Sequence, residues 1–267
     1  MKGRKRMALY NIYFSAKGTT KLCADYIADC LSLKTESYNW LSQPCREPMD
    51  FSREDVLLFT MPVYSGFIPK TCAQMAKFLR GNQTPAIIAA VYGNRHYDNA
   101  LLQMKDILDK QGFFVIAAGA FLAEHSVFPS VAHGRPDEQD KKAMADFAQS
   151  CTQLLQSDWY ELTEVTVPGL AEYNPESVEP LPFKPFGDEK CVRCGKCVEV
   201  CPQNAISIET PQDTNQDLCI NCGACIKVCP TGARNYHSKA YETVRQEFEN
   251  LCAEYRKPEM YYAEKQF

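Results

Sequence analysis

Two stretches of this chain decide its organisation: CVRCGKCVEVCP at residues 191–202 and CINCGACIKVCP at residues 219–230. Both follow the pattern C-x2-C-x2-C-x3-C-P, with a glycine after the second cysteine and a valine before the fourth. The chain has 14 cysteines in 267 residues, and 8 of them lie in these two stretches. The stretches are therefore an internal repeat that carries cysteine chemistry.

This spacing predicts two [4Fe–4S] clusters. The first three cysteines of a stretch can wrap one cubane, whereas the fourth lies past that loop and ligates the other cluster. A zinc site would need two C-x2-C pairs per metal and would leave cysteines idle, and disulfide frameworks are typical of short secreted chains. The ligands expected for one cluster are Cys191, Cys194, Cys197 and Cys229, and those for the other are Cys219, Cys222, Cys225 and Cys201. Strand-like pieces at 205–209 and 233–236 follow the two stretches.

The first 156 residues alternate strand and helix patterns. Short apolar runs and crossovers between them predict a doubly wound α/β fold with a five-stranded parallel sheet and helices on both faces. Ligands of such sheets bind at the carboxyl ends of the strands. The expected strands are 8–15, 36–40, 56–61, 86–92 and 113–119, and the expected helices include 70–80 and 137–156.

Three loops follow strands of this sheet. The loop at residues 15–20 is rich in hydroxyls, contains Gly18 and opens a helix, so it can hold a phosphate. It is neither G-x-G-x-x-G nor a Walker loop, which disfavours dinucleotides and ATP. The loops at 62–69 and 92–99 pair aromatic residues with glycine and would suit a flat ring. An ordinary threonine-capped turn and half-buried tyrosines that only pack are the alternatives.

Taken together, these motifs resemble the flavodoxin family over residues 7–156 and bacterial two-cluster ferredoxins over residues 187–237. The whole chain is similar to flavodoxin–ferredoxin fusions found mainly in anaerobic prokaryotes. The resemblance implies non-covalently bound FMN, although Lys17 stands where these phosphate loops usually carry a hydroxyl. The FMN-binding residues it implies are Ser15, Lys17, Gly18, Thr19, Thr20, Pro62, Val63, Tyr64, Ser65, Gly66, Tyr92, Gly93, Asn94, Arg95, His96 and Tyr97.

The chain is expected to comprise four parts: a flavodoxin-like domain at 7–156, a proline-rich linker at 157–186, a small α+β ferredoxin domain at 187–237, and a helical tail at 238–267. Its net charge of −4 gives no reason to expect nucleic-acid binding, and it has no twenty-residue apolar stretch for a membrane span. The basic opening MKGRKRM lacks a signal-peptide pattern, so a cytoplasmic location is expected. The six other cysteines are expected to be small buried residues.

The function predicted from these features is electron transfer between FMN and protein redox partners (a ferredoxin, a flavoprotein or an oxidoreductase) through two clusters. One alternative is a flavin-dependent reductase of a small substrate, with Arg95, His96 or His125 as proton donor. Another is a ferredoxin whose flavodoxin domain has lost FMN and serves docking or sensing, an option that Lys17 keeps open.

Overall fold

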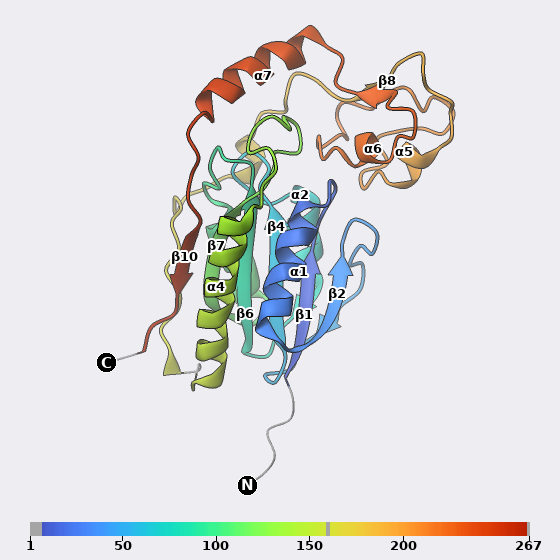
Figure 1. Cartoon of the computed structure of the whole chain (residues 1–267). Coiled ribbons are helices and arrows are strands. Elements are labelled where there is room, and N and C mark those ends of the chain that lie inside the picture. Colours follow the sequence, from blue (N-terminus) through green and yellow to red (C-terminus); the bar gives the residue numbers. More distant parts are fainter. Residues whose placement is uncertain (1–6, 159–160, 266–267) are drawn as a thin grey trace.

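The computed structural model describes residues 7–158 and 161–265. The basic residues 1–6, residues 159–160 of the expected linker and residues 266–267 of the expected tail lie outside this description. The chain forms a large lobe, residues 7–158 together with a C-terminal strand, and a small lobe, residues 186–237. Figure 1 shows the small lobe above one end of the sheet of the large lobe.

The large lobe is built on a six-stranded sheet with the order β10-β7-β6-β4-β1-β2. Five strands are parallel, and their order β2-β1-β4-β6-β7 is the flavodoxin-like one, which confirms the predicted fold class. Every residue of β4 and β6 is buried, as expected for central parallel strands covered on both faces. The strands are β1 (Ala8–Tyr13), β2 (Lys34–Asn39), β4 (Val56–Pro62), β6 (Thr84–Tyr92), β7 (Phe113–Leu122) and β10 (Glu259–Tyr262).

Helices cover both faces of the sheet. On one face α1 (Thr19–Leu31) packs against α4 (Glu138–Gln156), and Figure 1 shows both in front of the strands. The capping box of Asp137 and Asp140 fixes the start of α4, one residue from the predicted start. The opposite face carries α3 (Ala100–Lys110), α2 (Lys70–Met75) and the 3-10 turn η1 (Ala76–Phe78). Short strands β3 (Met49–Asp50) and β5 (Leu79–Arg80) form a separate parallel pair.

The expected sheet of five strands requires a correction, because a sixth strand comes from the tail. After α7 (Lys239–Leu251) the chain returns to the large lobe, and β10 pairs antiparallel with β7. The tail is therefore a helix followed by a strand. A four-residue edge strand has too little periodicity to be recognised in a sequence, and it forms here because β7 otherwise leaves an open edge.

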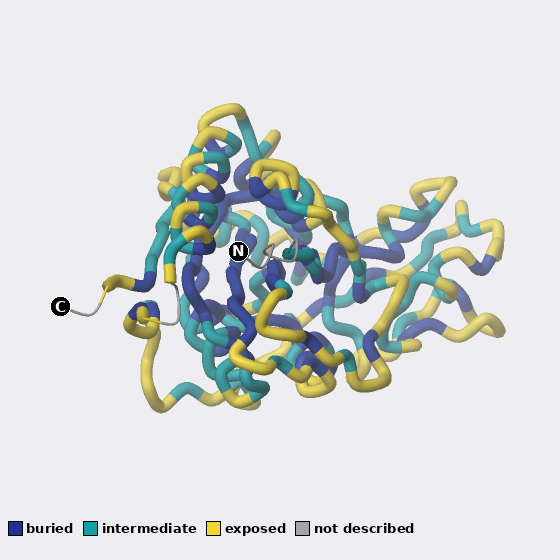
Figure 2. The backbone as a smooth tube through the Cα atoms, turned by 90° about the horizontal axis from the view of Figure 1, so that it is seen from below, coloured by how far each residue is buried: buried dark blue, intermediate teal, exposed yellow. Residues whose placement is uncertain are grey.

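The small lobe has little regular structure. Its strands β8 (Phe186–Gly187) and β9 (Arg234–Asn235) pair antiparallel, and α5 (Lys196–Glu199) and α6 (Ala224–Lys227) are single turns. The strand expected at 205–209 does not form, since only Ala205 and Ile206 are buried there and the next residues are exposed bends. Figure 2 shows that buried residues concentrate in the large lobe. In that lobe Cys30 is exposed, contrary to expectation, because it lies on the outer side of α1.

The small lobe is attached to the large lobe at both of its ends. The linker before it, which includes the 3-10 turn η3 (Pro175–Ser177), follows the large lobe: the Leu170 N–H donates to Asn99 Oδ1 at 2.7 Å and Tyr173 Oη donates to Asp106 at 2.9 Å. After it, α7 and β10 return to the sheet. A hydrophobic cluster joins the large lobe, the linker, the small lobe and α7, and it comprises Val127, Phe128, Val131, Phe183, Tyr236, Tyr241 and Cys252. The small lobe is thus held over the carboxyl ends of the strands.

Candidate cofactor site

The eight repeat cysteines line two separate cavities in the small lobe, four to each. The outer cysteine cavity is lined by Cys191, Cys194, Cys197 and Cys229. The inner cysteine cavity is lined by Cys201, Cys219, Cys222 and Cys225. Each cavity thus combines three cysteines of one repeat with the fourth of the other, the grouping expected from the spacing. None of these eight cysteines is paired in a disulfide bond.

The backbone around both cavities is arranged in matching ways. Gly195 and Gly223 have φ of 79° and 75° at the starts of α5 and α6, a left-handed conformation that favours glycine. Backbone N–H groups point at the fourth cysteine of each repeat: the Ala205 N–H donates to Cys201 Sγ at 3.2 Å and the Arg234 N–H donates to Cys229 Sγ at 3.4 Å. Such N–H donors stabilise negative charge on sulfur.

The cysteines of the inner cavity lie deeper than those of the outer one. Cys222 is 8% exposed and Cys225 is 7% exposed, whereas Cys194 is an exposed residue. Burial raises the pKa of Cys222 to about 12, so a thiolate at this position needs a positive charge beside it. Among the residues that the structure describes, no three His, Cys, Asp or Glu side chains converge enough to hold a single metal ion.

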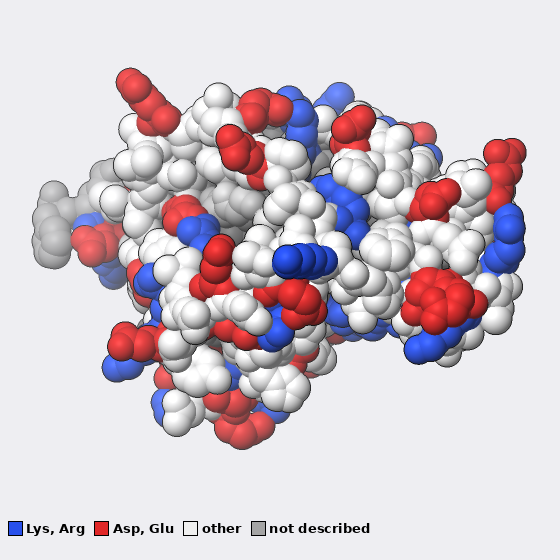
Figure 3. Space-filling model, turned by 90° about the horizontal axis from the view of Figure 1, so that it is seen from above, with Lys and Arg blue, Asp and Glu red and all other residues white. Residues whose placement is uncertain are grey.

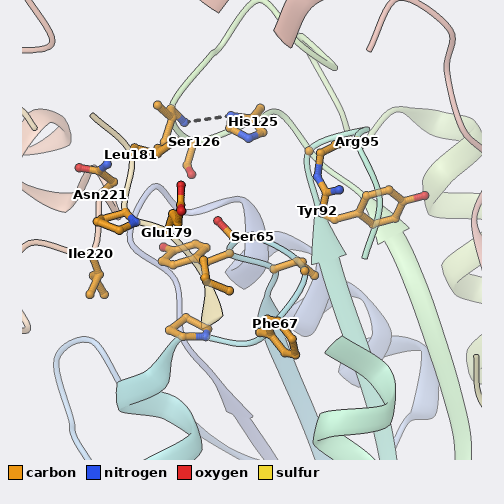
Figure 4. Close-up of a pocket in the computed structure, with 18 of the residues that line it drawn as sticks. Ser65, Phe67, Tyr92, Arg95, His125, Ser126, Glu179, Leu181, Ile220 and Asn221 are labelled. Carbon is orange, nitrogen blue, oxygen red and sulfur yellow. Dashed lines mark hydrogen bonds between the residues drawn. The ribbon is translucent and has the colours of Figure 1, made fainter. Parts of the chain in front are cut away.

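A large cavity of about 360 Å³ lies between the two lobes, a size within the usual range of small-ligand sites. Figure 4 shows Ser65 and Phe67 from the loop after β4, Tyr92 and Arg95 from the end of β6, and His125 and Ser126 from the loop after β7. The opposite wall comes from the linker and the small lobe, with Leu181, Ile220 and Asn221. Val244 and Phe248 of α7 complete the lining.

A small cavity adjoins the large one at the loop that opens α1. It is lined by Lys17, Thr19 and Thr20 of this loop, and Cys222 of the inner cysteine cavity also reaches it. The two cavities share Val63, Tyr64, Tyr92, Gly93, His125 and Ser126, so together they form one continuous site at the carboxyl ends of the strands. Burial lowers the pKa of Lys17, although the nearby carboxylate of Glu124 opposes this shift.

Most of the residues expected to bind FMN line these two cavities. They are Lys17, Thr19, Thr20, Pro62, Val63, Tyr64, Ser65, Gly66, Tyr92, Gly93, Arg95 and His96. Ser15, Gly18, Asn94 and Tyr97 do not appear in either lining. The Ser15 hydroxyl accepts from the Lys21 N–H at 3.0 Å, and Tyr97 is buried with its hydroxyl 2.7 Å from Glu259. The Asn94 side chain forms hydrogen bonds with the backbone of Cys252, Glu254 and Arg256 in the tail. The side chains of Ser15, Asn94 and Tyr97 therefore hold neighbouring segments in place and do not line the cavities.

Several lining residues had no signal in the sequence. The linker and α7 contribute Leu181 and Phe248, and the small lobe contributes Ile220 and Asn221. These residues lie far from the loops in sequence and reach the cavity only through the packing of the lobes. His125, singled out because it follows a predicted strand, does line both cavities.

His125 is held as a neutral ring. Its Nδ1 accepts from the N–H groups of Val127 at 3.2 Å and Phe128 at 3.0 Å, which places the ring proton on Nε2. Burial, with a smaller contribution from the charge of Arg95, lowers the pKa of His125 to about 4. The ring packs so closely on Gly93 that a Cβ there would lie 2.4 Å from His125 Cδ2, so this contact requires glycine.

Comparison with known families identifies the small lobe. Residues 190–233 match the family described as a 4Fe-4S dicluster domain. No curated protein matches the chain. Within the described residues, no helix has the length and apolar character needed to cross a bilayer.

Solved structures with detectable similarity match the large lobe at low identity. The rubredoxin oxygen:oxidoreductase of Desulfovibrio gigas is 12% identical, with 57% of this chain and 37% of that chain covered and a TM-score of 0.43. A flavodoxin of Streptococcus pneumonia is 14% identical, with 54% and 95% covered and a TM-score of 0.39. An azoreductase of Bacillus anthracis is 8% identical, with 55% and 98% covered and a TM-score of 0.38. This chain thus spans about a third of the first protein's length.

Proposed function

Because the chain joins a flavodoxin-like lobe to a 4Fe–4S dicluster domain, we propose that it is an iron–sulfur flavoprotein that transfers electrons between redox partners. The observation that carries this proposal is the position of Cys222, which belongs to the inner cysteine cavity and also lines the small cavity of the large lobe. The two candidate cofactor sites therefore share a wall.

The cysteine cavities fit two [4Fe–4S] clusters. Four thiols line each cavity, N–H groups donate to Cys201 and Cys229, and burial disfavours a free Cys222 thiolate. We propose Cys191, Cys194, Cys197 and Cys229 as ligands of the outer cluster and Cys201, Cys219, Cys222 and Cys225 as ligands of the inner one.

The joined large and small cavities fit FMN. The large cavity combines aromatic and aliphatic side chains with a few polar groups, as sites for flat ring systems do. The small cavity lies at the start of α1, where free N–H groups and the helix dipole favour an anion. We propose that residues 17–20 hold the phosphate and that Tyr64, Tyr92 and the backbone of the loops at 62–66 and 92–96 enclose the ring.

When bound, FMN exchanges two electrons in one-electron steps and each cubane exchanges one, so the three groups together can connect one-electron and two-electron partners. The protein's part is to hold the groups close together and to exclude water between them. The packing of Cys222 and Ala224 into the core of the large lobe serves both purposes. The exposed Cys194 places the outer cavity at the surface, where a partner can approach.

A second candidate is a reductase that acts on a small substrate above the flavin. The observation that favours it is the rim of the large cavity, where Arg95 and His96 are partly exposed. His125 beside them is neutral, with its proton on the nitrogen that has no backbone partner. A reductase would be recognised by a substrate that reoxidises the reduced protein directly.

The test of the proposed function is an anaerobic reductive titration of purified protein whose iron, sulfide and acid-released flavin are quantified. We expect about eight iron and one FMN per chain, and about four electrons taken up: two by the flavin and one by each cluster. The Cys194→Ala variant should lose about four iron and keep its FMN. Full iron with no flavin, even after FMN is added, would refute the proposal and leave a ferredoxin with a docking lobe.

A further inference from the structure

Two lysines from different lobes meet at the loop that opens α1. Lys17 belongs to this loop, and its Cδ lies 3.3 Å from the position of a Cβ at Gly223 of the small lobe. Lys227, the last residue of α6, reaches in the opposite direction: its Nζ lies 2.8 Å from the position of a Cβ at Gly18. Each lysine therefore crosses to the lobe that faces it.

Neither ammonium group has an anionic partner among the described residues, since neither lysine forms an ion pair within 4.0 Å there. Burial is the main cause that lowers the pKa of Lys17; the charge of Glu124 opposes this shift, and Lys227, as a like charge, adds a smaller lowering. Glu124 lines the same cavity, but its carboxylate lies 3.0 Å from His133 Nδ1 and accepts from the Gly134 N–H at 3.2 Å. The lobes thus bring two like charges close together, and the repulsion between them favours an anion at this place.

The small cavity that Lys17 lines also suits an anion. Thr20 is 4% exposed and lines the small cavity, and its hydroxyl has no hydrogen-bond partner in the described part of the chain. Gly18 at the N-cap position has no side chain to cap the thirteen-residue helix α1, and the Ser15 hydroxyl accepts only from the Lys21 N–H of the first turn. A group that accepts hydrogen bonds and carries two negative charges would satisfy the helix end, Thr20 and both lysines.

The internal repeat contains a matching signal. Lys227 lies two residues after the third cysteine of the second repeat, and the residue at the same place in the first repeat is Glu199. Glu199 is exposed on α5, and that repeat surrounds the outer cavity. The charge at this position is therefore reversed in the copy that faces the phosphate loop.

We propose that Lys227 and Lys17 form a composite site for the phosphate monoester of FMN, so that the small lobe supplies part of the flavin site of the large lobe. The inference rests on the proposed function, because it assigns residues to that cofactor. It also couples the lobes: phosphate binding stabilises their docking, and docking strengthens phosphate binding by the same factor. Lys17 stands where flavodoxin phosphate loops usually carry a hydroxyl, and in this site it would bind the phosphate together with Lys227.

The experiment compares dissociation constants of FMN and of riboflavin, which lacks the phosphate, by flavin fluorescence on full-length protein with equal iron content. Lys227→Ala should weaken FMN binding about 10- to 100-fold, the range for one lost charge-assisted hydrogen bond, and leave riboflavin binding unchanged. Lys196→Ala is the matched control, because Lys196 is exposed on α5 at the outer cavity and its removal changes the net charge equally. It should change neither constant.

Unchanged FMN binding in Lys227→Ala would overturn the inference. An equal loss of FMN and riboflavin affinity would also overturn it, since Lys227 would then act through lobe docking alone. Wild-type protein that binds neither flavin would instead refute the proposed function. The composite site would be supported if Lys227→Ala lost affinity for FMN but not for riboflavin. High salt should then weaken FMN binding to the wild type in the same selective way, because salt screens the lysine charges.

Discussion

Arg234 lines the outer cysteine cavity, is 2% exposed, and also lies close to Cys225 of the inner cavity. Its guanidinium donates to the carbonyls of Pro211 at 2.7 Å, Gln212 at 3.2 Å, Pro185 at 3.3 Å and Asp213 at 3.1 Å. Burial raises the pKa of Cys197 and of Cys225, and the charge of Arg234 opposes the shift in both. One side chain therefore ties the loops of the small lobe together and adds positive charge near both sets of thiols.

Replacing this side chain should destabilise the small lobe. Arg234→Met keeps much of the volume but leaves four carbonyls without their donor, at a cost of about 3 kcal/mol or more. The measurement is the denaturant midpoint for loss of the cluster absorbance under anaerobic conditions. Arg193→Met is the control, because Arg193 is exposed at the rim of the outer cavity and should cost less than about 1 kcal/mol. Equal midpoints for the two variants would contradict this role of Arg234.

His125 should make the large lobe sensitive to acid. The unfolded chain binds a proton to this residue below its ordinary pKa of about 6.5, whereas in the folded chain burial lowers the pKa to about 4. The unfolded state thus binds more protons between these values, so stability falls as pH drops from 6.5 to 4, by at most about 3 kcal/mol. Unfolding monitored by tryptophan fluorescence between pH 4 and 7 measures this slope. His125→Gln should flatten it, and an unchanged slope would assign the sensitivity to other groups.

At the scale of elements, the tail locks the loop after β6. Asn94, 1% exposed with φ of 61°, donates to the carbonyls of Cys252 at 2.9 Å and Glu254 at 3.0 Å and accepts from the Arg256 N–H at 2.9 Å. Further along the tail, Tyr261 of β10 lies 2.9 Å from Tyr97, hydroxyl to hydroxyl, and both bond to Glu259. These tail residues do not line the large cavity themselves. They hold the loop after β6, which does line it.

Asn94→Ala should release this segment. Two carbonyls and one N–H lose their partner, and alanine is strained at positive φ, so we expect a loss of about 2–4 kcal/mol in unfolding free energy. Limited trypsin digestion after the exposed Arg256 is the direct measurement, and cleavage should become faster. Asn94→Asp retains the acceptor but loses both donations, so it should fall between alanine and wild type. Cleavage at the wild-type rate in Asn94→Ala would show that the tail is held by β10 alone.

At the scale of the whole molecule, the lobes place the two cysteine cavities in unequal surroundings. The inner cavity adjoins the core of the large lobe through Cys222 and Ala224, whereas the outer cavity has the exposed Cys194 and Val192 at its rim. Acidic and basic side chains are interspersed over the face seen in Figure 3, so no single sign of charge dominates the approach to this side. Access to the outer cavity, rather than charge, therefore distinguishes the two cysteine cavities for an approaching partner.

This asymmetry should appear in the loss of iron. Under mild oxidation with a chelator we expect two phases of about equal amplitude, because the outer cluster is open to solvent and the inner one is covered by the large lobe. Iron release followed by a coloured chelate measures both phases. Cys194→Ala should remove the fast phase and leave the slow one. A single phase in the wild type would contradict the difference in access.

The sequence alone determined the two cysteine groups and the parallel sheet, since both follow from local spacing and local periodicity. The spacing C-x2-C-x2-C-x3-C predicts which four cysteines line each cavity, and the central strand β4 is buried throughout. The roles of the individual residues at the FMN site stay predictions. Tertiary structure alone decided that β10 completes the sheet, that Asn94 serves the tail, and that Lys227 reaches Gly18. These contacts join residues far apart in the chain. They depend on how whole elements pack, and local sequence patterns do not predict that packing.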